Sequence, residues 1–76
     1  MTADGVPDAD ERLRNLVHDL RTPLTIITGF CELLERQRDR LTPEQRDEYQ
    51  SRIKAAADDL VDILDQERAE RLSREL

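Results

Sequence analysis

Residues 13–34 read LRNLVHDLRTPLTIITGFCELL, and their apolar side chains recur at alternating steps of four and three residues. This spacing is that of a heptad stripe along one face of an α-helix. A second apolar row beside the first makes the stripe wider than a two-stranded coil requires, which indicates a bundle of more than two helices. The first row consists of Leu13, Val17, Leu20, Leu24, Ile27, Cys31, Leu34 and Leu41. The second row consists of Leu16, Ile26, Phe30 and Leu33.

A second helix is predicted after a break in this pattern. Thr42 suits the N-cap position, Pro43 suits the first helical position, and Gln45 can complete a capping box. The four-three spacing of apolar residues then resumes at Tyr49, Ile53, Ala56, Leu60 and Ile63.

Together the two segments predict an all-α fold, an antiparallel helical hairpin. A single hairpin leaves a broad apolar face uncovered, and pairing with a second copy would cover it, giving a homodimeric four-helix bundle. The predicted organisation is a flexible leader or linker at residues 1–8, followed by one hairpin domain over 9–76. Within that domain we expect a helix over about 9–39, a turn at about 40–42 and a helix over about 43–74.

Composition limits the chain to one small helical domain. It has 76 residues, of which 39% are charged and 37% hydrophobic. A chain of this length buries little apolar surface alone, which favours self-association or attachment to more protein. The net charge of −6 disfavours nucleic acid and anionic membranes as partners, because both would repel the chain.

Targeting and metal signals are missing from the sequence. No apolar run approaches the roughly 18–20 residues that cross a bilayer, and the N-terminal segment lacks the basic and apolar regions of a signal peptide. We therefore expect no membrane insertion of this segment and a cytoplasmic location. Cys31, the only cysteine, can form no internal disulfide and supplies no metal cluster. Its neighbours Ile27 and Leu34 predict that it is a small core residue.

His18, the only histidine, falls just outside the apolar stripe, on the solvent side of the first predicted helix. Arg14 and Arg21 lie about one turn away on the same face. A neutral exposed imidazole can act as a nucleophile, and two guanidinium groups beside it could attract a phosphoryl group or a carboxylate-lined partner. An exposed histidine on a charged helix can equally be an ordinary solvated residue, so spacing alone leaves chemistry at His18 open.

Pro23 predicts a bend in the same helix, close to His18. Proline lacks the N–H that would bond the carbonyl of Asp19, its ring crowds that carbonyl, and Thr22 before it is pushed away from helical angles. Gly29 adds a second soft point. Asp19 points about 100° away from His18 on an ideal helix, so a local distortion is needed before it can assist the ring.

Residues 17–25, V-H-D-L-R-T-P-L-T, resemble the H-box of sensor histidine kinases, within the HisKA-type dimerisation and histidine-phosphotransfer domain. The family pattern is histidine, an acidic residue, any residue, a basic residue, threonine or asparagine, and proline, usually followed by an apolar residue. Residues 18–24 fill every place of it. The downstream I-x-G-F/Y element is matched by Ile27, Gly29 and Phe30. The resemblance covers about residues 9–70.

The resemblance implies the dimerisation and phosphoacceptor domain of a two-component sensor histidine kinase. His18 would accept the γ-phosphoryl group of ATP and pass it to an aspartate of a response-regulator receiver domain. Asp19 would orient the ring or take its proton, as bases do for other nucleophiles. Thr22 would help to position water for dephosphorylating the regulator. The supporting residues would be Arg14, Arg21 and Pro23, the last through the helix bend.

The chain departs from the family's kinases in lacking their nucleotide-binding motifs. It has no N-box asparagine region, no D-x-G-x-G and no glycine-rich lid. We therefore expect no cofactor to be bound by this chain and no autophosphorylation by it alone. ATP and Mg²⁺ would act through an ATP-binding catalytic domain in cis or in trans. The other expected partners are a second copy of the chain and a receiver domain, and the location would suit the cytoplasmic part of a membrane-bound sensor.

Two alternatives remain open at this point. The chain could be a stand-alone histidine phosphotransferase that relays between receiver domains without ATP. It could also be a purely structural coiled-coil dimeriser with a coincidental H-box, in which case His18→Gln would change nothing measurable.

Overall fold

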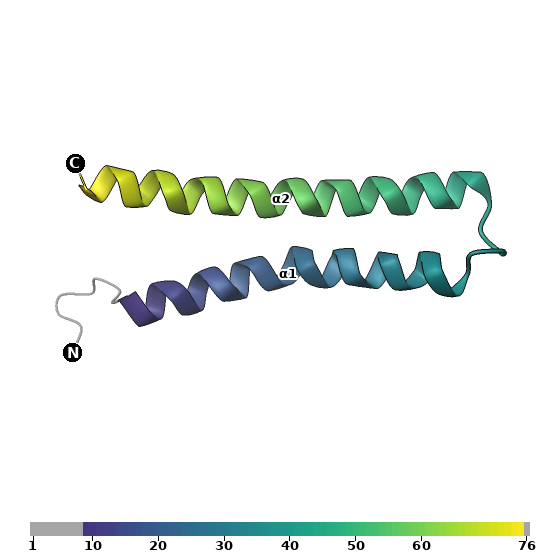
Figure 1. Ribbon diagram of the computed structural model, residues 1–76, viewed down its shortest axis with the longest axis horizontal. Helices are drawn as coiled ribbons and strands as arrows, with labels where there is room; N and C mark the ends of the chain where they lie inside the picture. The colour runs from purple at the N-terminus through teal and green to yellow at the C-terminus, as the bar shows by residue number, and fades with distance from the viewer. Residues whose placement is uncertain (1–8, 76) are drawn as a thin grey trace.

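Two antiparallel α-helices make up the fold in the computed structural model, which describes residues 9–75. Helix α1 spans Ala9–Arg36 and helix α2 spans Pro43–Glu75, and they lie side by side as a hairpin (Figure 1). No strand occurs within the described residues, so the predicted all-α hairpin is confirmed. The predicted leader at residues 1–8 lies outside the described part of the chain. Neither helix combines the length and the apolar character needed to cross a bilayer.

Helix α2 begins at the capping box that the sequence predicts. The Gln45 N–H donates to Thr42 Oγ1 at 3.1 Å, and the Thr42 N–H donates to Gln45 Oε1 at 3.0 Å. Pro43 fills the first helical position, where its missing N–H costs no hydrogen bond. Two of the unpaired N–H groups at this helix end are thereby satisfied.

Helix α1 ends at Arg36, earlier than the predicted end near residue 39. The N–H groups of Arg40 and Leu41 both donate to the carbonyl of Gln37, at 2.8 and 3.1 Å. The Arg46 Nη2 of α2 reaches back to the carbonyl of Arg38 at 3.3 Å. These turn contacts replace the helical ladder, so the connection occupies residues 37–42 instead of the predicted 40–42.

The two helices contact each other along one row of side chains from each. Of that row only Pro23 and Ala56 are buried, and both are small enough to let the helices approach closely. Near the turn, the rings of Phe30 and Tyr49 pack with their centroids 5.3 Å apart. The half-buried members of the row are Leu16, Leu20, Ile27, Phe30 and Leu34 from α1, with Tyr49, Ile53, Leu60 and Ile63 from α2.

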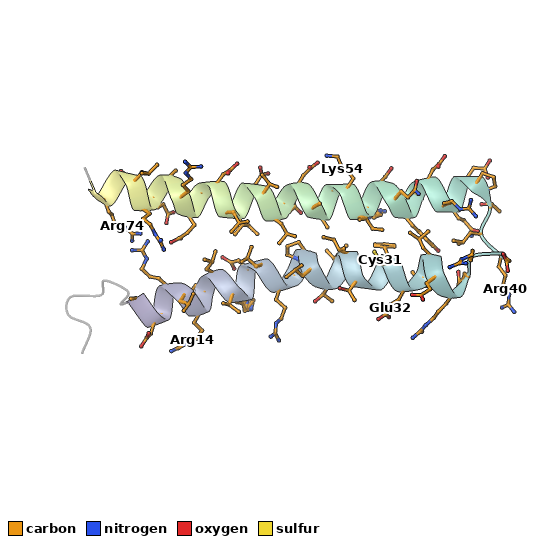
Figure 2. All side chains as sticks on the ribbon, viewed as in Figure 1. Arg14, Cys31, Glu32, Arg40, Lys54 and Arg74 are labelled. Carbon is orange, nitrogen blue, oxygen red and sulfur yellow. The ribbon has the colours of Figure 1, made fainter. Side chains whose placement is uncertain are left out.

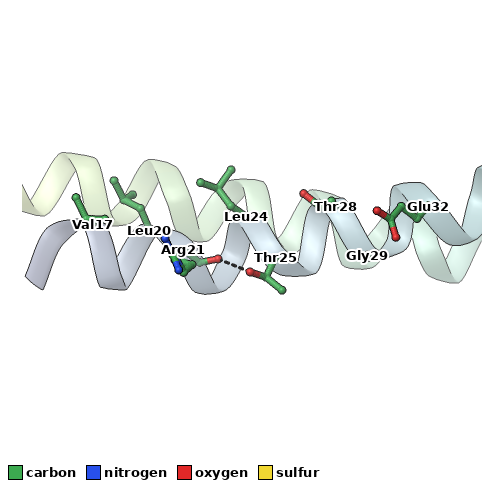
Figure 3. Close-up of a pocket in the computed structure, with 8 residues that line it drawn as sticks. All are labelled: Val17, Leu20, Arg21, Leu24, Thr25, Thr28, Gly29 and Glu32. Atoms are coloured by element: carbon green, nitrogen blue, oxygen red, sulfur yellow. Dashed lines mark hydrogen bonds between the residues drawn. The ribbon is translucent and has the colours of Figure 1, made fainter. Parts of the chain in front are cut away.

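The remaining half of the apolar stripe stays uncovered. Several of its large side chains are half exposed or more, because a single neighbouring helix is too narrow to cover a stripe this wide. Each of these exposed side chains directly follows a residue that faces the other helix, and so lies about 100° around its own helix from the contact. In two antiparallel helices, positions turned in this way fall on the same side of the pair. We call this surface the uncovered face; it consists of Leu13, Val17 and Leu24 of α1 with Val61 and Leu64 of α2. Figure 3 shows Val17, Leu20 and Leu24 projecting from one side of α1.

Cys31 is exposed, so the prediction that it is a core residue is wrong for the single hairpin. It follows Phe30, which takes the contact with α2, and therefore lies on the side of α1 that α2 does not cover.

Helix α1 bends near its middle, with its N-terminal half directed away from α2 (Figure 1). Pro23 lies inside the helix at this level and is buried. The bend has the physical cause expected of proline, a missing N–H opposite the Asp19 carbonyl and a ring that crowds it. Across the open end of the hairpin, the Arg12 guanidinium pairs with Glu70 at 3.8 Å.

Candidate functional site

His18 lies exposed on α1, at the level of the bend. Within residues 9–75, its imidazole makes no hydrogen bond and no ion pair. The ring borders two shallow surface grooves, one between the helices and one on the outer side of α1. Its nitrogen atoms are therefore free to meet a group that approaches from solvent.

The interhelical groove is formed by both helices. Its α1 side consists of His18, Asp19, Thr22 and Pro23, and its α2 side of Asp59, Asp62, Ile63 and Gln66. The carboxylates of Asp59 and Asp62 have no ion-pair partner among the described side chains. The groove is consequently acidic on its α2 side and would favour a partner that brings positive charge.

The outer groove is formed by α1 alone. It is lined by His18, Arg21, Thr22, Thr25 and Ile26, so the His18 and Arg21 side chains border the same groove as two threonines. Thr25 Oγ1 donates a hydrogen bond to the Arg21 carbonyl at 2.9 Å. Thr22 belongs to both grooves, one turn from His18.

The predicted site residues are brought together only in part. Asp19 shares the interhelical groove with His18, but no hydrogen bond joins their side chains in the described structure, as adjacent positions on a helix would suggest. Arg14 is exposed and points away from α2 (Figure 2), and it lines neither groove. Arg21, Thr22 and Pro23 all border the imidazole's grooves.

The α2 side of the groove has no counterpart in the sequence interpretation. Asp59, Asp62 and Gln66 were not singled out, because the apolar spacing of α2 draws attention to its contact row. The register of the hairpin brings them to the groove: Phe30 packs on Tyr49 near the turn and Arg12 pairs with Glu70 at the open end. This register places His18 opposite the stretch that contains the three polar residues.

Residues 9–74 match the HisKA family, the His Kinase A (phospho-acceptor) domain. The chain belongs to this family. The resemblance seen in the H-box is thereby confirmed, and this HisKA domain is a domain of the kind found in sensor histidine kinases of two-component signal transduction.

Two relatives support the same assignment. The sensor protein GacS of Pseudomonas syringae pv. syringae and the sensor histidine kinase GacS of Pseudomonas protegens are each 45% identical to the chain over 56 residues. The match covers 74% of this HisKA domain but only 6% of the length of each relative. No solved structure matches the chain.

Proposed function

We propose that this HisKA domain accepts a phosphoryl group on His18 and passes it to an aspartate of a response-regulator receiver domain. The observation that carries the proposal is an exposed imidazole without a partner, at the junction of two grooves and at the H-box position of a HisKA chain. Membership of the family supports phosphoacceptor chemistry in general, and the location of His18 supports this residue as the acceptor.

The first step is a displacement at phosphorus. A neutral ring nitrogen of His18 attacks the γ-phosphorus of ATP, an N–P bond forms, the bond to the bridging oxygen breaks, and ADP leaves. The ring proton departs to a base, and Asp19 is the nearest candidate because it borders the same groove. Arg21 lies in the outer groove, where its guanidinium can neutralise charge on the transferred group.

ATP and Mg²⁺ are held by a catalytic domain in cis or in trans in this proposal. The described residues contain no group of three His, Cys, Asp or Glu side chains that could hold a metal ion, and the sequence has no nucleotide-binding motif. In this proposal the chain supplies the acceptor nitrogen and its surroundings.

The second step requires a receiver domain on the interhelical groove. A carboxylate oxygen of the receiver's aspartate attacks the phosphorus, the N–P bond breaks, and His18 regains a proton. Because Asp59 and Asp62 lie unpaired along this groove, a regulator with basic residues beside its aspartate is the partner that fits best. Thr22, which borders both grooves, is proposed to position a water molecule that dephosphorylates the regulator.

The uncovered face is proposed to bind a second copy of the chain. Val17 and Leu24 are each 50% exposed and Val61 is 55% exposed. Contact of this apolar surface with water is unfavourable, and pairing of two hairpins would remove it. A two-fold symmetric pair of hairpins would form a four-helix bundle. His18 lies outside the uncovered face, so the dimer leaves it accessible.

Phosphotransfer profiling tests the proposal. The domain is phosphorylated with its kinase catalytic domain and ATP, freed of nucleotide, and mixed with the purified receiver domains of the source cell, one at a time. We expect loss of the acid-labile phosphate from the domain and its appearance on one preferred receiver. The His18→Gln variant is the control and should carry and transfer none. A phosphorylated domain that transfers to no receiver would contradict the second step.

A further inference from the structure

Thr25 forms a hydrogen bond that the proposed chemistry does not use. Its Oγ1 donates to the carbonyl of Arg21 at 2.9 Å, one turn back along α1 (Figure 3). The Arg21 carbonyl is also the acceptor for the backbone N–H four residues on, as in any α-helix. A threonine hydroxyl that adds to this backbone bond bends a helix.

The hydrogen bond and Pro23 lie on opposite sides of the helix. Pro23 is buried against α2, whereas Arg21 and Thr25 are exposed on the outer side of α1. Helix α1 bends away from α2, so its outer side is the inner curve of the bend (Figure 1). Proline opens the backbone ladder on one side at Asp19. On the other side the Thr25 hydroxyl shares the Arg21 carbonyl with the backbone N–H, an arrangement that bends helices. The hydroxyl and the proline therefore both act on the curvature of this segment of α1.

The outer groove lies on this inner curve. His18, Arg21 and Thr25 all border it, so the curvature decides how the guanidinium and the imidazole approach each other. A change in the bend would displace one turn of the helix with respect to the next, and would therefore move the His18 and Arg21 side chains relative to each other.

We infer that Thr25 is a positioning residue: its hydroxyl holds the bend of α1 and thereby the placement of Arg21 beside His18 for phosphoryl transfer. The inference rests on the proposed phosphoacceptor role of His18. Thr25 itself touches neither the phosphoryl group nor the imidazole in this account; it acts through the Arg21 backbone.

Two substitutions separate the hydroxyl from the rest of the side chain. Thr25→Val removes the hydrogen bond and keeps the branched shape, while Thr25→Ser keeps the hydroxyl and removes a methyl group. Thr28→Val is the matched control, because Thr28 is exposed on the same helix and its hydroxyl makes no hydrogen bond in the described structure.

The structural readout is the angle between residues 9–19 and 25–36 of α1, from residual dipolar couplings of the whole chain. We expect a smaller angle in Thr25→Val and the wild-type angle in Thr25→Ser and Thr28→Val. This measurement does not depend on any phosphoryl chemistry. An unchanged angle in Thr25→Val would overturn the inference while leaving the proposed function untouched.

The functional readout uses two small probes. Phosphoramidate tests phosphoryl acceptance by His18, and diethyl pyrocarbonate tests access to the same imidazole without a phosphoryl group. For Thr25→Val we expect the second-order rate constant of phosphorylation by phosphoramidate to fall about two- to tenfold, the effect of one hydrogen bond, with no change in the carbethoxylation rate. Thr25→Ser should restore the wild-type value. Equal losses with both probes would show altered access and overturn the positioning role. A wild-type domain that accepts phosphate from neither phosphoramidate nor its kinase domain would instead refute the proposed function.

Discussion

Replacing Pro23 with alanine should stabilise the hairpin and straighten α1. Proline in the interior of a helix costs about 3 kcal/mol relative to alanine, because it removes one backbone hydrogen bond and crowds a carbonyl. Pro23 is also buried against α2, and alanine lacks two of its ring methylene groups, a loss of about 1.6 kcal/mol at 0.8 kcal/mol each. The difference predicts that Pro23→Ala raises the free energy of unfolding by about 1–2 kcal/mol.

The assay is urea unfolding followed by far-UV circular dichroism. All variants are compared at one protein concentration, because self-association adds to the apparent stability. Gly29→Ala is the matched control: a Cβ at Gly29 would meet open space, and alanine in a helix gains up to about 1 kcal/mol over glycine. The control should be stabilised without any change in the bend measured by residual dipolar couplings.

Under the proposed function, straightening α1 in a reconstituted full-length kinase should also change the balance of kinase and phosphatase activities, since His18 and Thr22 lie at the bend. Gly29→Ala should leave that balance closer to wild type. The reasoning would be refuted by a Pro23→Ala hairpin that is no more stable than wild type or that keeps the wild-type bend.

The other predictions concern the uncovered face, the cap, and the two sides of the groove. Leu24→Lys places a charge in the proposed dimer contact. Leu24 is 50% exposed in the hairpin, so each copy loses about half of the burial energy of a leucine, about 1.5–3 kcal/mol for the pair, and the dimer Kd in sedimentation equilibrium should rise at least about tenfold. Thr42→Ala removes the capping hydrogen bond and should lower the free energy of unfolding by about 1 kcal/mol, and an unchanged urea midpoint would contradict the cap's role. Thr22→Ala should slow dephosphorylation of the regulator more than its phosphorylation; equal losses would remove its specific role. Asp62→Lys should slow transfer to the preferred receiver at low salt, whereas Asp65→Lys, which reverses an equal charge outside both grooves, should not.

The parts of the fold that depend on neighbouring residues were predictable from the sequence. The capping box joins Thr42 to Gln45 three residues on, and its two hydrogen bonds follow from local chemistry. The end of α1 could not be predicted in this way, because Arg46 of α2 donates a hydrogen bond to the Arg38 carbonyl, a contact that no local sequence pattern contains. Cys31 was assigned to the core from its apolar neighbours, but one partner helix covers only part of the stripe on which it lies.

The candidate site likewise has a part on α1 that the sequence predicts and a part on α2 that it does not. His18 and Asp19 are adjacent on one helix and Thr22 follows one turn later, and the H-box presents them together in the sequence. Asp59 and Asp62 reach the groove only through the register of the hairpin, which the length of the turn determines. A predicted turn at residues 40–42 in place of the observed 37–42 shifts that register, so the opposite side of the groove required the structure.

Intact-mass analysis of the chain and of His18→Gln tests the central claim most directly. Each is incubated with ATP alone, and with ATP together with extract from the source cell, and any added phosphate is assayed for acid lability and base stability. The account predicts one acid-labile, base-stable phosphate, only on the wild-type chain and only with the extract. Labelling by ATP alone would contradict the expectation that nucleotide is held elsewhere, and the same phosphate on His18→Gln would contradict His18 as the acceptor.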